Sequence, residues 1–530
     1  MKKWLCVLLA CSLLLCGCSK DRSAESAETY AETEAEILPE HTEAPGEPAA
    51  ESFGLAYVEK YGFNPYNCIC ITNRPVFSLV YESLFVLSNR FEPEPVLCEQ
   101  FAVSESGKNY VFTLCEGITF SDGDPLTAAD VVASLEAARD SDYYGTRFSK
   151  VASFSAKDSR TVQIDLYYPY ENLPLLLDVP IVKASTVKDT EPVGSGPYAF
   201  SKTGEAKTLS RNPNWWQERS APVEYDTILL TAAKDPTEIR DSFEFGDTSL
   251  VCADLNAPTA VGYRCDYELW DCPTTTMLYI GFNLGAGMFV NREFRAAVTH
   301  AIDRKGIITS VYKGFGEPAY LACSPVSGLY DAELAENYKY DLSAFQQARN
   351  QAGIHPDYVG TLLVCSADPT RVETAHRIAE MLTAAGARVD VTAVDYDTYR
   401  YRLNVGQYDL FIGEARLSGN YDLTEFFKKY GSLCIGGIQS GAMEQLCYDA
   451  LENSGNCYDL QRNVMEHGYI CPILFKSYAV MANRGTISNL QPAVDNVFHL
   501  PGGRTLADAS TTYEALTNPG SGEETEEQTP

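Results

Sequence analysis

The stretch from residue 360 to residue 413 alternates strand-like and helix-like patterns more regularly than any other part of this 530-residue chain. Apolar runs predict the strands, and apolar residues at helical spacing predict the helices between them. Strands that alternate with helices pair in parallel, so the stretch predicts an α/β fold. The expected elements are strand 360–366, helix 369–385, strand 388–394, a helix from 395 and strand 408–412.

Elsewhere the local patterns are also clear. Tyr110–Leu114 alternates like a strand, and Thr127 and Asp130 form a capping-box start for a helix. A further helix is expected over Arg292–Ala301, and Asp303 is expected to cap the helix after it.

The N-terminus has the features of an export signal. Lys2 and Lys3 precede the apolar run Trp4–Leu15, which is shorter than the roughly 20 residues that a membrane span needs. Leu15-Cys16-Gly17-Cys18 resembles the lipobox of bacterial lipoproteins, although Cys16 is an unusual small residue there. The resemblance implies a signal peptide and lipobox over 1–18, lipid on Cys18, and attachment at the outer face of the cytoplasmic membrane. An ordinary secretory signal is the alternative.

Composition separates the ends of the chain from its middle. Residues 19–52 and 508–530 are acidic and poor in apolar residues, so we expect a disordered linker and a disordered tail. The long region between them is expected to form two or more domains. The formal net charge of −31 excludes nucleic acid as a partner, because phosphate binding needs a basic surface.

The chain has 17 cysteines, of which three leave with the signal peptide and Cys18 takes the lipid. The odd number that remains requires at least one free thiol or one intermolecular bond. No Cys-x-x-Cys occurs, and the histidines are scattered. Most cysteines are therefore interpreted as small buried apolar groups, and no metal site is expected.

Enzymatic patterns are weak. Ser310–Lys313 and Lys202–Gly204 match two elements of penicillin-recognising enzymes, but in reversed order. Gly-x-Ser-x-Gly, His-Glu-x-x-His and phosphate-loop patterns are absent, and a plain turn explains Asp122 and Asp124. We therefore expect no catalytic residue and no cofactor; an extracellular hydrolase is the remaining enzyme hypothesis.

Longer motifs are specific and occur in a fixed order. They are the segments 81–85, 120–134, 194–198, 211–216, 279–283, 294–304, 314–319, 408–411 and 471–474. Together they resemble the extracellular solute-binding proteins of family 5, which are the peptide- and nickel-binding receptors of ABC importers. The resemblance covers about residues 53–500.

The resemblance implies a two-lobed clamshell of the type II periplasmic-binding-protein kind. Lobe 1 would hold residues 53–273 and a return segment, 476–507, and lobe 2 would hold 274–475, with a hinge near Thr276 and Lys476. A peptide-like solute would bind between the lobes and be passed to an ABC permease and its ATPase subunits. A sensory or scavenging receptor without its own permease, and a structural surface protein, are the alternatives.

The expected ligand residues lie in the motifs and in the segment from Arg416 to Phe427. In peptide-binding members an Asp holds the peptide amino group three residues before an acid-Pro pair. Here Asp422 matches the acid, but Leu423 replaces Pro and Gly419 occupies the anchoring position. Asp422 takes over that role, or the ligand lacks a free amino group. The full candidate set is Tyr81, Tyr198, Trp215, Trp216, Arg416, Asn420 and Asp422. Arg416 would pair with a carboxylate or form a surface ion pair, and the aromatic residues would contact ligand or pack in the core.

Overall fold

The computed structural model describes residues 52–517 except 218–222, 356 and 488. The predicted signal peptide, Cys18, most of the linker and the end of the tail lie outside the described residues. Among the helices that are described, none is both long enough and apolar enough to cross a membrane.

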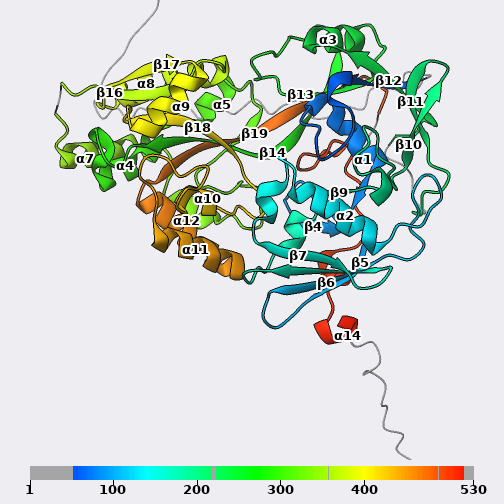
Figure 1. Ribbon diagram of the computed structural model, residues 1–530. Coiled ribbons are helices and arrows are strands. Elements are labelled where there is room, and N and C mark those ends of the chain that lie inside the picture. Colours follow the sequence, from blue (N-terminus) through cyan, green and yellow to red (C-terminus); the bar gives the residue numbers. More distant parts are fainter. Residues whose placement is uncertain (1–51, 218–222, 356, 488, 518–530) are drawn as a thin grey trace, which may run out of the picture. The chain divides into compact units, whose positions relative to one another are not determined.

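The largest sheet of the described residues has the strand order β10-β11-β12-β1-β13-β19-β14-β18-β16-β17, and β15 pairs with β19 beside this path (Figure 1). In that order the strands are β10 Tyr198–Thr203, β11 Ala206–Arg211, β12 Thr227–Ala233, β1 Phe53–Val58, β13 Leu250–Ala253, β19 Ile470–Asn483, β14 Tyr267–Phe282, β18 Leu410–Arg416, β16 Gly360–Cys365, β17 Val389–Val394 and β15 Gly316–Pro318.

Smaller sheets accompany it. One has the order β5-β6-β8-β7, and the pairs β2 with β9 and β3 with β4 form two others. Their strands are β5 Cys98–Val103, β6 Asn109–Leu114, β8 Thr161–Leu166, β7 Val151–Ala156, β2 Glu82–Ser83, β9 Pro180–Ile181, β3 Phe85–Leu87 and β4 Pro93–Pro95.

The α-helices are α1 Phe77–Val80, α2 Ala128–Arg139, α3 Pro236–Glu244, α4 Arg292–Ala297, α5 Arg304–Ser310, α6 Ala332–Glu336, α7 Leu342–Ala352, α8 Pro369–Ala384, α9 Tyr396–Val405, α10 Thr424–Phe427, α11 Gly441–Glu452, α12 Cys457–Glu466, α13 Leu506–Ala509 and α14 Tyr513–Thr517. The 3-10 turns are η1 Glu59–Tyr61, η2 Ile71–Val76, η3 Gly145–Phe148, η4 Leu173–Leu176, η5 Ala184–Thr186, η6 Met288–Val290, η7 Val298–Ala301 and η8 Ser454–Asn456. Thus α13 begins before the predicted tail, 508–530, and ends in it, and α14 lies inside it, so helices occupy part of the segment that was expected to be disordered.

The α/β stretch folds as its pattern predicts. Strand β16 pairs in parallel with both β17 and β18, and α8 and α9 connect them in sequence. The caps follow the sequence too: the side chain of Asp303 accepts from the Gly306 N–H, and Thr127 and Asp130 form the capping box of α2. The predicted α/β class is confirmed.

Two hydrophobic cores divide these elements. The first core contains buried residues from the range 53–272 and from 480–509, together with Leu451. The second core draws only on the range 278–474. A third cluster bridges them, because Leu87, Phe91, Leu175 and Val494 pack in it with residues from 277–475. Below, the first half means residues 52–272 and 480–509 together with the loop that joins β19 to them, and the second half means residues 277–475, which supply nearly all members of the second and third clusters.

Strands β14 and β19 run through both halves (Figure 1). Near β13 they pair Tyr267 with Asn483, and near β18 they pair Gly281 with Ile470. The register shifts between Pro273 and Met277, where the Thr274 hydroxyl donates to the Lys476 carbonyl at 2.7 Å. This irregular point lies at the predicted hinge residues.

Direct contacts also join the halves away from these strands. The Lys150 ammonium lies 3.3 Å from the Asp422 carboxylate, and the Glu171 N–H donates to the Leu451 carbonyl at 2.9 Å. The rings of Tyr168 and Tyr448 lie 4.7 Å apart. The two halves therefore touch along a face that does not depend on the shared strands.

Thirteen cysteines lie in the described residues, and none of them forms a disulfide there. Eight are buried. Burial raises the pKa of several of these thiols, for example those of Cys98, Cys272 and Cys323, so they stay protonated at neutral pH. They pack as apolar groups, as predicted.

Arg304 gives a direct test of how the second half is held together. Its side chain is 1 % exposed, and its guanidinium donates to the carbonyls of Thr299, Ala319 and Pro472, which lie on three separate segments. Arg304→Met should leave these buried acceptors unsatisfied and cost about 3 kcal/mol or more of unfolding free energy, measured by urea denaturation. The exposed Arg388→Met is the control and should change stability by less than about 0.5 kcal/mol. Equal effects would contradict the assignment.

Candidate functional site

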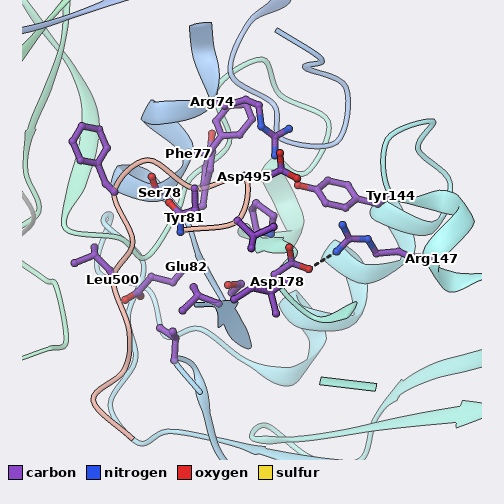
Figure 2. A pocket seen from close by; sticks show the side chains of 18 of the residues that line it. Arg74, Phe77, Ser78, Tyr81, Glu82, Tyr144, Arg147, Asp178, Asp495 and Leu500 are labelled. Carbon is purple, nitrogen blue, oxygen red and sulfur yellow. Dashed lines mark hydrogen bonds and ion pairs between the residues drawn. The ribbon is translucent and has the colours of Figure 1, made fainter. Parts of the chain in front are cut away.

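A pocket of about 800 Å³, partly open to solvent, lies beside η2 and α1. Its walls come from the first half, from the loop that follows β19, and from Arg416 at the end of β18. Figure 2 shows Arg74, Tyr81, Glu82 and Asp495 among the side chains that line it. The pocket therefore adjoins the point where the two halves are connected.

Among the described residues, four neutral donors bind the carboxylate of Glu82. It accepts hydrogen bonds from the indole N–H groups of Trp215 and Trp216, from the Gln217 amide and from the Ser195 hydroxyl, at 2.7–3.2 Å. Glu82 is only 7 % exposed. Four donors compensate the loss of water around a buried carboxylate, so this group is held rigidly at the pocket wall.

The glycines of the turn 194–198 explain how Ser195 reaches Glu82. A β-carbon on Gly194 would lie 2.0 Å from the Val80 carbonyl oxygen, and one on Gly196 would lie 2.7 Å from that of Leu79. The turn passes directly over the backbone that leads into Glu82, and the Gly196 N–H donates to the Val80 carbonyl at 2.9 Å. Only glycine permits this approach.

Arg416 reaches the pocket from the second half. Its guanidinium donates to the Asp495 carboxylate at 2.6 Å and lies 3.7 Å from the centre of the Tyr143 ring. Burial alone would lower the pKa of Arg416, but Asp495 outweighs it and raises that pKa. The side chain is still 29 % exposed, so solute can reach it.

The Asp495 carboxylate is positioned by the crossing strands. The Asp495 N–H donates to the carbonyl of Pro273 in β14 at 2.9 Å, and its backbone has φ of 55°. Position 416 in turn lies opposite Thr276 of β14. Both partners of the ion pair are therefore attached to the same short part of β14.

Two more arginines line the pocket. Arg147 forms an ion pair with Asp178, drawn as a dashed line in Figure 2. Arg74 lies 4.3 Å from the centre of the Tyr143 ring. Arginine, carboxylate and phenol groups in fixed positions suit the recognition of a charged solute. In residues 52–517, apart from the gaps given above, no cluster of His, Cys, Asp or Glu side chains has the geometry of a metal site.

The structure brings together part of the predicted set. Tyr81 and Arg416 line the pocket, while Trp215 and Trp216 contact it through Glu82. Burial raises the pKa of Tyr81 far above its ordinary value, and its phenol donates to the Phe63 carbonyl at 2.9 Å. Tyr198 is fully buried, with its hydroxyl against the carbonyls of Val223 and Tyr225, so it packs in the core.

Asn420 and Asp422 lie elsewhere. They line a second, smaller cavity of about 320 Å³ in the second half. The Asp422 carboxylate accepts from the Thr424 N–H at 2.8 Å and pairs with Lys150. Their placement joins the two halves and does not bring them to the pocket of Arg416.

Sequence reasoning missed several residues of the pocket. Arg74, Arg147, Asp178 and Asp495 line it but were not candidates. Arg74 precedes the Tyr81 motif by seven residues, and Asp495 lies in the predicted return segment. The one available signal was Glu82, an acid next to Tyr81 inside a recognised motif.

A family model matches more than half of the chain. The model described as bacterial extracellular solute-binding proteins, family 5 Middle, matches residues 92–432. A curated relative, the glutathione-binding protein GsiB of Salmonella typhimurium, is 25 % identical over 349 residues, which cover 63 % of this chain and 67 % of the relative.

Solved structures share the fold at low identity. The periplasmic murein tripeptide binding protein MppA, in an unliganded open form, matches with a TM-score of 0.68 and 16 % identity, over 86 % of this chain and 98 % of MppA. HbpA2 from Haemophilus parasuis matches with a TM-score of 0.67 and 19 % identity, over 82 % and 95 %. The two-lobed type II fold of periplasmic binding proteins is therefore confirmed for this chain.

The Glu82 cluster can be tested alone. In Glu82→Gln one acceptor oxygen becomes an N–H₂ group that faces indole donors, so we expect a loss of about 2 kcal/mol in unfolding free energy. Tryptophan fluorescence should shift, because Trp215 and Trp216 lose a charged acceptor. The exposed Glu105→Gln should change neither quantity. Unchanged stability and emission in Glu82→Gln would show that the carboxylate is not required.

Proposed function

Because the chain belongs to the bacterial extracellular solute-binding proteins of family 5, we propose that it captures a peptide-like solute in the pocket beside Arg416 and delivers it to the permease of an ABC importer. The observation that carries this proposal is the position of Arg416. It belongs to a strand of the second half but contacts Asp495 and Tyr143 of the first. A solute held there touches both halves.

Such contact couples binding to closure. A ligand shifts the balance between an open and a closed state only by the difference in its affinity for the two. We place lobe 1 at residues 53–273 and 476–507, lobe 2 at 274–475, and the hinge near Thr276 and Lys476. The register shift of β14 against β19 supports this hinge, because a break in a ladder is where strands bend most easily.

The Lys476 side chain adds an electrostatic link at the hinge. Its ammonium lies 2.8 Å from Asp254 and 3.6 Å from Glu414, which belong to different lobes in this assignment. Burial alone would lower the pKa of Lys476, but the two carboxylates raise it, so the charge is kept at neutral pH. The contacts between Lys150 and Asp422 and between Tyr168 and Tyr448 support a closed state for this structure.

The chemistry of the pocket wall favours a short peptide or a similar compound. Its guanidinium groups suit a solute that carries a carboxylate. The relative GsiB is named for glutathione, a tripeptide with two carboxylates and one amino group. Glutathione is therefore the first probe to test.

Delivery to a permease fits an anchored receptor better than a freely diffusing one. We propose that Cys18 carries a lipid at the outer face of the cytoplasmic membrane, and that the acidic segment 19–52 is the tether. The lipobox-like residues before Cys18 support this proposal.

Glutathione binding tests the proposed function. A hundredfold excess of ligand over its Kd should stabilise the folded protein by about 2.7 kcal/mol, seen as a higher melting temperature. Arg416→Met should weaken binding about tenfold or more, because it removes a charged donor from the pocket. Isothermal titration calorimetry measures both affinities.

Arg388→Met removes the same charge from an exposed site outside the pocket and should bind as the unsubstituted protein does. If neither glutathione nor a panel of di- and tripeptides stabilises the protein, the peptide-like solute is wrong. If Arg416→Met binds with unchanged affinity, the pocket is wrong.

The anchor has its own test. Cys18→Ser should abolish incorporation of an alkyne-labelled fatty acid and move the protein from the membrane fraction to the soluble fraction. Cys68→Ser, which alters a buried cysteine, should leave both unchanged. Absence of label in the unsubstituted protein would contradict the lipid on Cys18.

A further inference from the structure

Arg74 has a donor that is not used within the described residues. Its Nη1 atom is buried and has no hydrogen-bond partner there. A buried, unsatisfied N–H group of a guanidinium costs free energy, so its retention at a pocket wall needs a reason. Arg416 and Arg147, the other arginines of this pocket, each have a carboxylate partner.

The backbone holds Arg74 in place independently of that donor. It lies in η2, next to the fully buried Asn73, whose side chain bonds to the Val58 N–H and to the carbonyls of Val58 and Gly62. The Phe77 N–H donates to the Arg74 carbonyl, and the guanidinium lies over the Tyr143 ring. Little conformational entropy remains to be lost when Arg74 binds a partner.

The local charge is unbalanced. Arg74 and Arg416 both lie over Tyr143, and a single carboxylate, Asp495, faces both of them. In Figure 2, Asp495 lies next to Arg74. Glu82 and Asp178 also line the pocket, but each is held by its own donors. Among the described residues, one positive charge is therefore left over beside Tyr143.

We propose that Arg74 receives a carboxylate of the solute, and that the pocket selects solutes by this anionic group and not by an ammonium group. The inference rests on the proposed function, since it concerns the ligand of the same pocket. A carboxylate placed at the free Nη1 neutralises the excess charge and satisfies the buried donor. An ammonium group at the same place would face two guanidinium groups and a carboxylate that is already paired.

Blocked forms of glutathione test the proposal. For the unsubstituted protein we expect the diethyl ester, which lacks both carboxylates, to bind about 10- to 100-fold more weakly than glutathione. N-acetylglutathione, which lacks the ammonium group, should bind within about threefold of glutathione. In Arg74→Met the difference between glutathione and its diester should shrink to a few-fold, and Arg74→Lys should restore part of it.

The outcomes separate this inference from the proposed function. If glutathione and its ester bind the unsubstituted protein equally, or if Arg74→Met weakens both by the same factor, Arg74 is not the carboxylate receptor although the protein is still a receptor. If N-acetylation abolishes binding, the selection against ammonium is wrong. If neither glutathione nor any di- or tripeptide of the panel binds, the proposed solute class fails, and this inference fails with it; if only a peptide binds, its ester and its N-acetyl form replace those of glutathione. The ligand-free melting temperature of each variant, and Arg388→Met as the charge-matched control, show whether a loss reflects misfolding.

Discussion

Strands β14 and β19 pair with each other beside the first core and again beside the second, with a break between Pro273 and Met277. β13 pairs with one end of β19, and β18 pairs with the opposite end of β14. The register of the β14–β19 pair shifts between Pro273 and Met277 and again between Leu278 and Tyr279. The ion pair of Arg416 and Asp495 is attached to β14 at the first of these shifts, through Thr276 and Pro273.

Charged side chains are concentrated in the pocket beside this part of β14. Guanidinium groups stacked on Tyr143 keep their charge in a partly buried place, and one internal carboxylate compensates only part of it. Glu82 differs from these arginines, because among the described residues its carboxylate accepts hydrogen bonds from neutral donors. The two sides of the pocket therefore differ. Arg74 has a buried N–H donor with no partner among the described residues, whereas the Glu82 carboxylate already accepts hydrogen bonds from its neighbours.

Local signals predicted the fold well because they depend on neighbouring residues. Asp303 and Thr127 cap their helices as expected, and β16, β17 and β18 pair in parallel. The pocket was only partly predictable, since it is made by residues far apart in sequence. Arg74 and Arg416 meet at Tyr143 through the crossing strands, which no local pattern encodes. Tyr198 was a ligand candidate because it lies in a motif. Its hydroxyl instead donates to the carbonyls of Val223 and Tyr225 in the core.

The return of the chain after β19 has a consequence for how the protein is made. Residues 480–509 belong to the first core, although that core begins at Phe53. Ribosomes and export machineries deliver a chain from its N-terminus, at roughly 5–20 residues per second during synthesis. The first core therefore cannot be completed until β19, which pairs with β13, has been synthesised. The pairing of β13 with β19 joins residues that are far apart in the sequence, and such contacts form slowly because a long loop must close first.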